Sequence, residues 1–564
     1  MKQLRNKWTP YVIAYAVVAL IAFAAYYIML PPVHLQSKEF WGFLTFLVVL
    51  AGAPVWLLGG ALADLKEQIE QQSKRYVHAR SYHIPTKKGI RIWLALAALP
   101  LAVLVVGGIL SSTLFFARSY AGVIDVEEAV FAEDMPEAKK ITNIALMDTD
   151  TARIVGSRTL GSLSHVVSQY EISSQYNQIN YQRTPQKVSH LEYAGFFKWI
   201  GNRKNGVPGY VMVDPVNNTA EYKELETSLK YVESGFFGDD LLRKLRFSYP
   251  TKILGDTRFE INDEGEPFFI VPCYRPQVFL FGAMDVTEVI VFDPCTGESE
   301  IYAVEESPAW IDGVYDGYLA CEKFDWKGLY SGGFINSIIG NRDCKQTTDD
   351  FGYVVIEDDV WYYTGVTSVN SDKSNIGFIL SNARTGEYKF YPVIGAEEHS
   401  AMAAAEGEVQ EKEYVASFPA LVNISGRATY IMVLKDAGGL VKLYALVNVE
   451  KYSIVATGTT QEKAMEQYKQ LLLAEGMITD EDAAPDDRET LDITVEERRI
   501  VTRNGESTLY IDVTHNGEHR VYRAAIAADE ALMLIREGDV LTVTAAETEI
   551  MGIYEIISWA FRAQ

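Results

Sequence analysis

Three long runs of apolar residues without a charged side chain stand near the start of the chain, at 11–30, 40–62 and 92–117. Each run reaches the roughly 20 residues that a helix needs to cross a hydrocarbon layer about 30 Å thick. The pattern therefore predicts three transmembrane helices that form a membrane anchor at 1–118. A cleaved signal peptide is the alternative for the first run, and it is disfavoured because Leu-Pro-Pro-Val follows that run where a small-residue cleavage site would stand.

Lysine and arginine are distributed unevenly around these runs. Seven of them stand in the loop at 63–91, whereas Lys38 is alone between the first and second runs. Basic loops stay on the cytoplasmic side of a membrane. We therefore expect the N-terminus and the loop 63–91 in the cytoplasm, three helices in the plasma membrane, and all residues after Arg118 outside.

Between 119 and 476, short stretches of alternating apolar and polar residues are interrupted by Gly, Asn and Asp, which predicts strands joined by tight turns. The clearest turn reads Asp-Pro-Cys-Thr-Gly: the aspartate can accept bonds from turn amides, the proline fixes φ, and the glycine can adopt a positive φ. Similar turns recur upstream and downstream. The turn residues are Asp214, Pro215 and Asn218 in the first copy, Asp293, Pro294 and Gly297 in the second, and Asn382 and Gly386 in the third.

Two fainter copies of the turn begin at Asp148 and Asn448 and lack the glycine. The irregular spacing of the five copies predicts tandem repeats at 119–476, each a small, hairpin-rich α+β unit. Helical patterns fit between the hairpins. One of them begins with a capping-box pattern at Thr459 and Glu462 and stops at Gly476.

An acidic, proline-containing stretch at 477–490 predicts a linker. Beyond it, at 491–564, the pattern is three strands, a short helix and two strands, with Asn-Gly turns after the first and second strands. This order is that of the five-stranded OB-type barrel. The fold class predicted for the whole chain is thus α+β: three membrane helices, tandem α+β repeats and a small OB-like barrel.

The combination of a strand, an Asp-Pro-x-Thr-Gly-Glu turn, a second strand and a short helix resembles the PepSY-type repeats of bacterial extracytoplasmic proteins. The residues that carry the resemblance are 289–302, 209–222 and 377–391. The resemblance implies small α/β modules that are tethered to a membrane and that regulate or restrain partner proteins in the cell envelope.

Charge excludes one class of partner. Residues 1–118 carry a net charge of +8, and the whole chain carries −24, so that the remainder carries −32. The barrel, counted from Arg488 onward, has 8 basic and 14 acidic residues. Nucleic-acid-binding domains need basic surfaces. We therefore expect no nucleic-acid partner.

Motifs for catalysis are absent from the sequence: it has no G-x-S-x-G, H-E-x-x-H, Walker or dinucleotide-binding pattern. Catalytic and cofactor-binding residues are therefore not assigned, and no cofactor is expected. A metal site stays undecided. His515 and His519 could bind a metal across an Asn-Gly turn, but solvent-facing turn histidines are the favoured interpretation.

The four cysteines, Cys273, Cys295, Cys321 and Cys344, all fall in the part predicted to lie outside the cell. An even number in an oxidising compartment suggests disulfides, and Cys321 with Cys344 is the preferred pair. Buried, reduced thiols are the alternative.

These patterns favour a non-catalytic scaffold or regulator of the cell envelope that binds other envelope or membrane proteins, with a homo-oligomer as a further possibility. Two alternatives remain. One is an extracytoplasmic hydrolase with an unrecognised, dispersed active site. The other is a transmembrane sensor that signals through the loop 63–91.

Overall fold

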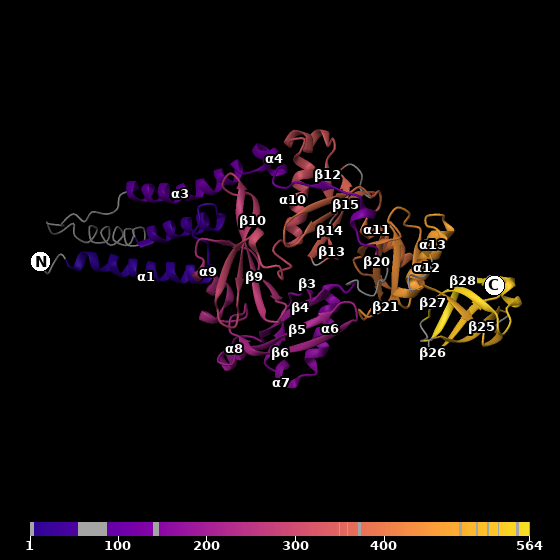
Figure 1. Cartoon of the computed structure of the whole chain (residues 1–564). Helices are drawn as coiled ribbons and strands as arrows, with labels where there is room; N and C mark the ends of the chain where they lie inside the picture. Colours follow the sequence, from indigo (N-terminus) through magenta and orange to yellow (C-terminus); the bar gives the residue numbers. More distant parts are fainter. Residues whose placement is uncertain are drawn as a thin grey trace, which may run out of the picture. The chain divides into compact units, whose positions relative to one another are not determined.

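The computed structural model describes residues 5–54, 87–138, 146–348, 350–357, 359–369, 374–483, 488–503, 506–515, 518–527, 529–548 and 552–562. Helices and strands are both abundant, so the predicted α+β class is confirmed (Figure 1). The chain forms two compact units. The first comprises residues 1–137 and 141–455, and the second comprises 138–140 and 456–564.

Two helices within the described ranges are long and apolar enough to cross a membrane, as is consistent with a membrane anchor. They are α1 (Arg5–Met29) and α3 (Lys87–Leu110), with apolar windows at Val12–Met29 and Arg91–Leu110. The second predicted span, 40–62, is helical as far as residue 54. Its remainder, and the loop 63–91 up to residue 86, lie outside the described residues.

The third predicted run, 92–117, is divided in the structure. Helix α3 ends at Leu110, and α4 (Thr113–Ala121) begins after Ser111 and Ser112. The hydroxyl of Ser111 donates to Gly107 O at 2.6 Å, so it bonds to the last turn of α3. The apolar run thus contains a membrane-length helix and a short helix that belongs to the folded part behind it.

Four helix–sheet modules make up most of the first unit, and their sheets share one strand order. In each, a long strand pairs with two short strands along one edge and with a long neighbour along the other, and a further strand completes the sheet. The orders are β2-β4-β5-β6, β7-β9-β10-β11, β12-β14-β15-β16 and β18-β20-β21-β22, with β3, β8, β13 and β19 as the second short strand.

Each module is a continuous segment of the chain. The first module contains α6 (Thr149–Gly161), α7 (Ser164–Val167), β2 (Tyr170–Ile172), β3 (Asn177–Tyr181), β4 (Thr184–Tyr193), α8 (Phe196–Asn202), β5 (Val207–Asp214) and β6 (Thr219–Leu229). The second contains η2 (Phe237–Asp239), α9 (Leu241–Ser248), β7 (Ile253–Leu254), β8 (Arg258–Ile261), β9 (Pro267–Val278), β10 (Gly282–Phe292) and β11 (Ser299–Ala303). The third contains α10 (Gly317–Tyr330), η4 (Asn336–Gly340), β12 (Lys345–Thr347), β13 (Gly352–Ile356), β14 (Asp359–Ser368), β15 (Ser374–Asn382), β16 (Tyr388–Tyr391) and β17 (Gly395–Ala396). The fourth contains α11 (Glu398–Glu408), β18 (Val415–Ala416), β19 (Ala420–Ile424), β20 (Arg427–Lys435), β21 (Val441–Asn448) and β22 (Val455–Gly458).

An acidic side chain begins the main helix of every module. Asp148, Asp240, Asp316 and Glu397 each accept a hydrogen bond from a backbone amide in the first turn of α6, α9, α10 and α11. Such a cap satisfies amides that have no partner within the helix. Asp148 is therefore a helix cap, and its prediction as a hairpin turn was wrong. Asn448 ends β21 and accepts from the amide of Lys451 at the start of the turn to β22, as predicted.

Neighbouring modules share their hydrophobic cores. One core joins the first and second modules through residues such as Tyr210, Phe259 and Phe269. Another joins the third and fourth through Phe378 and Tyr430, whose rings meet edge to face at 5.8 Å.

A short strap from the chain before the first module crosses the third. Strand β1 (Glu127–Glu128) pairs in parallel with β16, and α5 (Phe131–Asp134) follows it. Phe131 meets the ring of Tyr391 edge to face at 5.9 Å. The strap covers the outer edge of the third sheet.

The second unit begins within β22 and contains α12 (Gln461–Ala474), α13 (Asp480–Ala483) and one six-stranded sheet. Thr460 caps α12, one residue after the predicted position, and the helix stops before Gly476, whose φ is +68°. The strands of the sheet are β23 (Arg488–Thr494), β24 (Glu497–Arg503), β25 (Glu506–His515), β26 (Glu518–Ala525), β27 (Val540–Glu547) and β28 (Ile553–Phe561). Their order is β23-β27-β28-β26-β25-β24, and only β26 and β28 are parallel. The predicted Asn-Gly turns lie outside the described residues.

Candidate functional site

The predicted turns form as expected from their residues. Asp293 Oδ1 accepts from the amide of Cys295 at 2.7 Å, and Asn382 Oδ1 accepts from the amide of Arg384 at 2.9 Å. Gly297 and Gly386 have φ values of +81° and +74°, and their amides donate to the carbonyls of Asp293 and Asn382. In the first copy, Asp214 accepts from two turn amides, and Asn218 takes the positive φ, at +55°.

Each later turn is contacted by the linker that precedes its module. The amides of Lys230 and Tyr231 donate to Pro294 O at 2.8 and 3.0 Å. One module later, the amides of Val314 and Tyr315 donate to Ala383 O at 3.0 and 2.8 Å. The last of these contacts is simpler: the amide of Ala396 donates to Val449 O at 2.9 Å. In all three joints, the acceptor is the residue directly after the Asp or Asn of the turn.

A tyrosine ring completes two of the joints. The ring of Tyr231 lies over Gly297, and the ring of Tyr315 lies over Gly386, so closely that a Cβ atom on either glycine would overlap the ring. Both rings are buried. The turns at 293–297 and 382–386 are therefore architectural contacts between a module and the linker before it.

A buried polar cluster surrounds the second of these joints. Arg258 of β8 donates from Nη1 to Tyr315 O at 2.8 Å and to the hydroxyl of Tyr362 at 3.0 Å. Glu260, two residues further on, accepts from the amides of Asp312 and Gly313, each at 3.0 Å. These contacts join the second module to the third.

The same cluster reaches the first module and encloses a small cavity. Asp312 Oδ2 accepts from the amide of Asn180 at 2.7 Å. The cavity beside it, lined among others by Glu260, Asp312 and Tyr353, has a volume of about 20 Å³. Such a volume holds one or two water molecules. Although two carboxylates line it, the cavity has no room for a substrate.

Burial raises the pKa of Glu260, against the opposing effects of the amides of Asp312 and Gly313 and of Arg258. It lowers the pKa of Lys187, which lies 5.5 Å from the ring of Tyr353, to about 8. A cluster whose acceptors are already occupied by backbone amides is typical of a structural joint.

All four cysteines are free in the structure. The preferred disulfide, between Cys321 and Cys344, is therefore not formed here. Cys344 is buried, and its Sγ lies 3.6 Å from Leu329 O. Burial raises the pKa of Cys273, Cys295 and Cys321 to about 12 and also raises that of Cys344, which keeps these thiols protonated at neutral pH.

His515 and His519, in the sheet of the second unit, do not form a metal site in the described part of the chain. His519 Nε2 lies 3.1 Å from Asp512 Oδ1, and His515 pairs with Glu518 in the sheet. No group of three or more His, Cys, Asp or Glu side chains suited to a metal occurs among the residues that the structure describes.

An ordered apolar loop follows α10, and sequence reasoning missed it. Ile335, Ile338 and Ile339 are 74%, 60% and 81% exposed on and beside η4. Asn336 holds the loop in shape: its Nδ2 donates to Arg342 O at 2.9 Å, and its Oδ1 accepts from the amide of Arg342 at 3.2 Å. We call Ile335, Ile338 and Ile339 the isoleucine loop.

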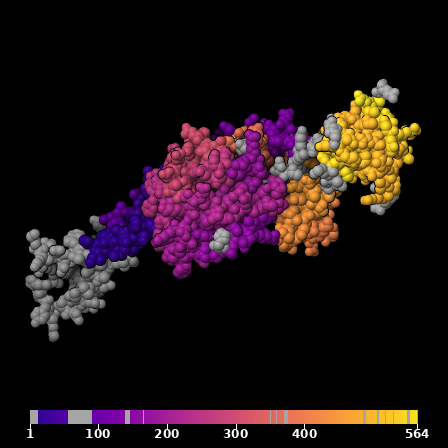
Figure 2. Space-filling view, turned by 60° about the horizontal axis from the view of Figure 1, so that its bottom comes forward, coloured from indigo at the N-terminus to yellow at the C-terminus, as the bar shows by residue number. Residues whose placement is uncertain are grey.

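Soluble protein surfaces rarely gather large aliphatic side chains unless they contact something. The signal in the sequence was the segment Gly-Gly-Phe-Ile-Asn-Ser-Ile-Ile-Gly, whose isoleucines fit neither strand alternation nor a core helix. On the face of the modules that Figure 2 presents, the surface is continuous and shows no deep hollow. The loop is therefore the candidate functional site, and its chemistry is apolar contact.

No family model and no curated protein matches this chain. Among solved structures, an exo-β-1,3-galactanase from Phanerochaete chrysosporium, determined with β-1,3-galactotriose, aligns with a TM-score of 0.16 and 6% identity. The alignment covers 69% of this chain and 71% of that one. A similarity this low supports no statement about fold or activity.

Proposed function

We propose that this protein is a non-catalytic scaffold of the bacterial cell envelope, anchored in the plasma membrane, that binds another envelope or membrane protein. The observation that carries the proposal is the set of three joints. Each linker is hydrogen-bonded to the turn of the next module, so that neighbouring modules keep a fixed orientation. Their exposed surfaces are therefore presented in a fixed arrangement, as a scaffold requires. The cavity at the second joint has room for water but not for a substrate, which argues against a hydrolase centred there.

The proposal includes the resemblance of the modules to PepSY-type repeats and that of the second unit to an OB-like barrel. Four modules of one strand order support the interpretation as PepSY-like repeats. In the second unit, the order β23-β27-β28-β26-β25-β24 would be that of an OB-like barrel if β23 and β24 are the halves of a bent first strand. The net negative charge of that unit favours a protein partner over nucleic acid.

The isoleucine loop is the proposed contact with the partner. The test is co-purification from crosslinked, intact cells that carry the full chain with Ile335→Asp and Ile339→Asp together. We expect the loss of proteins that the wild type enriches, because aspartates would have to be buried without partners in an apolar interface. Ile394→Asp is the matched control, since Ile394 is 73% exposed and lies outside the loop.

Two outcomes would contradict this function. One is that the wild type enriches nothing beyond a chain without its extracytoplasmic part. The other is that the double variant and Ile394→Asp enrich the same proteins equally. Enrichment of a second copy of the chain, lost in the double variant alone, would identify the partner as the protein itself.

The proposed orientation places the modules outside the cytoplasm. A C-terminal fusion to alkaline phosphatase, which is active only outside, tests it against a fusion to a fluorescent protein that matures only inside. We expect phosphatase activity and no fluorescence. The basic residues flank the ends of the apolar helices that lie away from the modules, and basic flanks stay in the cytoplasm. Fluorescence without phosphatase activity would reverse the orientation.

A further inference from the structure

The ends of the two apolar helices are held against the second module. Arg246 of α9 donates from Nε to Leu30 O, just after α1, at 2.9 Å. The amide of Phe281, in the turn between β9 and β10, donates to the hydroxyl of Ser111, just after α3, at 3.0 Å. These bonds place α9 and the β9–β10 turn at the level where both apolar helices end (Figure 1).

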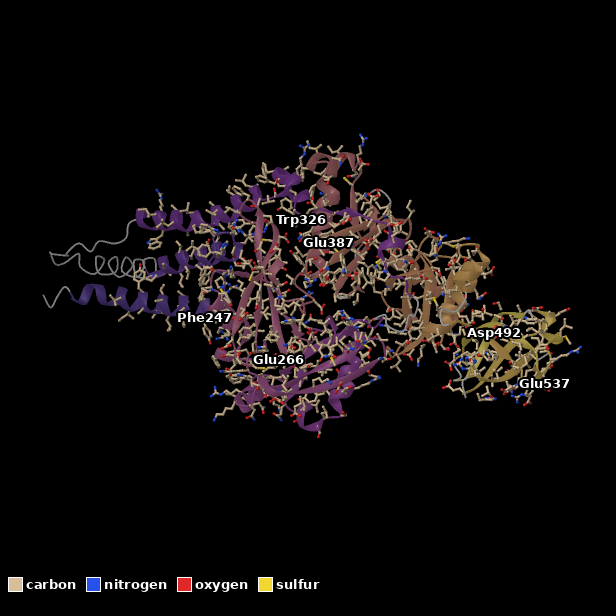
Figure 3. All side chains as sticks on the ribbon, viewed as in Figure 1. Phe247, Glu266, Trp326, Glu387, Asp492 and Glu537 are labelled. Atoms are coloured by element: carbon tan, nitrogen blue, oxygen red, sulfur yellow. The ribbon has the colours of Figure 1, made fainter. Side chains whose placement is uncertain are left out.

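Half-exposed aromatic rings stand at this level. Phe247 of α9 meets Tyr26 of α1 edge to face at 6.0 Å, and Figure 3 shows it beside the end of that helix. Phe279 of the β9–β10 turn stacks on Phe116 of α4 at 6.1 Å. Both rings therefore continue the apolar surfaces of the helices while leaving about half of their own area uncovered.

Arg243 links α1 to the segment that contacts α8. Arg243 donates from Nε to Tyr27 O at 3.2 Å and from Nη1 to Phe237 O at 2.8 Å. The exposed ring of Phe237 lies 5.8 Å from Trp199 of α8, and on the same helix Phe197 is 84% exposed. Figure 1 shows α8 and α9 at the end of the first unit that faces α1.

Helix α9 has the side-chain distribution of a helix that lies flat at an interface. Leu241 and Leu245 are buried in the module, whereas Leu242 and Phe247 are exposed beside them. A helix of a soluble domain would place polar residues at the exposed positions. Aromatic and aliphatic residues beside arginine and lysine are typical of protein surfaces at the headgroup level of a membrane.

We propose that this end of the first unit rests in the headgroup layer of the same bilayer that α1 and α3 enter. The interfacial surface comprises Phe197, Ile200, Phe237, Leu242, Phe247 and Phe279. Its occupant is phospholipid, because the surface is continuous with the apolar helices and reaches outward from their ends. The modules would thereby have a fixed distance from the membrane and a fixed angle to it. This inference rests on the membrane anchoring in the proposed function.

The test uses p-benzoylphenylalanine, a photoreactive amino acid, in place of Phe197 or Phe247 in the purified full chain. The chain is reconstituted into vesicles of phosphatidylethanolamine and phosphatidylglycerol, so that lipid is the only other molecule present. Val17 of α1 is the positive control for insertion. Tyr318 is the negative control, because it is 74% exposed and lies on α10 of the third module.

After illumination, mass spectrometry measures the phospholipid adducts. We expect adducts at 197 and 247 at roughly a third or more of the yield at 17, since interfacial side chains reach the acyl boundary, and only background at 318. Adducts at 17 with only background at 197 and 247 would overturn the interfacial surface and leave the anchor intact. Background at 17 as well would overturn the anchoring.

The same variants in intact cells exclude a different occupant. If 197 and 247 formed adducts with another protein and none with lipid, the surface would be a protein interface, and the lipid proposal would fail.

Discussion

At the residue scale, Gly297 and Gly386 each meet two requirements at once. Each adopts a positive φ, which costs most residues about 1 kcal/mol or more, and each lies beneath a tyrosine ring. The turn conformation is local and could be predicted from Asp293, Pro294 and Gly297. The contact with the ring of Tyr231 could not be predicted, because nothing in the turn itself specifies a partner from the linker before the module.

Replacement of either glycine should therefore destabilise the first unit. We expect Gly297→Ala or Gly386→Ala to cost about 1–3 kcal/mol, from backbone strain and displacement of the ring. The midpoint of thermal unfolding of the detergent-solubilised chain measures the effect. Gly407→Ala is the control, because Gly407 lies in α11 with open space around its Cα, and alanine favours a helix. Equal midpoints for all three variants would contradict the account of the turns.

Glu398 is buried, no basic side chain among the described residues pairs with it, and it makes the stability of the first unit depend on pH. Its carboxylate accepts from the amide of Gly365 at 2.6 Å and from the hydroxyl of Thr348 at 3.1 Å. Burial raises its pKa from 4.5 to about 7. The folded state thus binds this proton more tightly than the unfolded state. The stability that it contributes is complete below pH 4.5 and is lost as the pH rises towards 7.

Glu398→Gln should remove this dependence. Relative to the wild type, the variant should gain stability between pH 4.5 and 8, on the order of 3 kcal/mol. Unfolding midpoints across that pH range measure the difference. Glu408→Gln, at the exposed end of the same helix, should leave the pH profile unchanged. A profile of Glu398→Gln that runs parallel to that of the wild type would show that this carboxyl is not responsible.

At the element scale, Asp148 shows where sequence patterns become ambiguous. An aspartate that begins a turn and one that caps a helix both accept bonds from amides two or three residues ahead. The residues after the aspartate decide between the two structures: Asp293 precedes Pro-Cys-Thr-Gly, whereas Asp148 precedes Thr-Asp-Thr-Ala, which continues as α6. The copy at Asp148 lacks the glycine of the other turns, and this was the signal in the sequence against a hairpin there.

The joints between modules make a prediction of their own. Tyr315 contributes its amide, its carbonyl and its ring to the second joint. Tyr315→Ala should cost about 3 kcal/mol or more by removing a buried ring. Hydrogen–deuterium exchange should accelerate in the turn at 382–386, which loses the ring that covers it, and much less in the sheet of the second unit.

Tyr318→Ala is the matched control for this experiment, since Tyr318 lies three residues further along and is exposed. It should leave exchange in the turn as it is in the wild type. If the two variants changed exchange at 382–386 equally, the joint would not depend on the buried ring.

At the scale of the whole molecule, repetition was visible in the sequence because every hairpin turn obeys the same local chemistry. The strand order shared by the modules was not visible in the sequence. It depends on contacts beyond the turn, such as the pairing of β4 with β2 and β3. Likewise, the break of the third apolar run at Ser111 and Ser112 was missed, because serine lowers the helix propensity of a segment only slightly.

The second unit has a hydrophobic core of its own, formed by residues such as Leu509, Ile511 and Leu541. We expect residues 477–564, expressed alone, to fold with a cooperative thermal transition and a β-rich circular dichroism spectrum. Ile511→Ala should lower its stability by about 2–5 kcal/mol, because it leaves a cavity. Ile557→Ala, at a partly exposed position, should have a smaller effect. A fragment without a cooperative transition would show that this sheet depends on α12 or on the rest of the chain.

The strap at β1 and α5 also has a consequence for biosynthesis. Lys389 bonds to Asp134 at 3.1 Å although the two residues are 255 positions apart. At roughly 5–20 residues per second, the ribosome needs on the order of tens of seconds to add the later partner. Until then the strap has no strand to pair with, while its neighbour, the anchor, is already made. The strap therefore stays unpaired during this interval and is open to wrong pairing, whereas β16 finds its partner already made when it emerges.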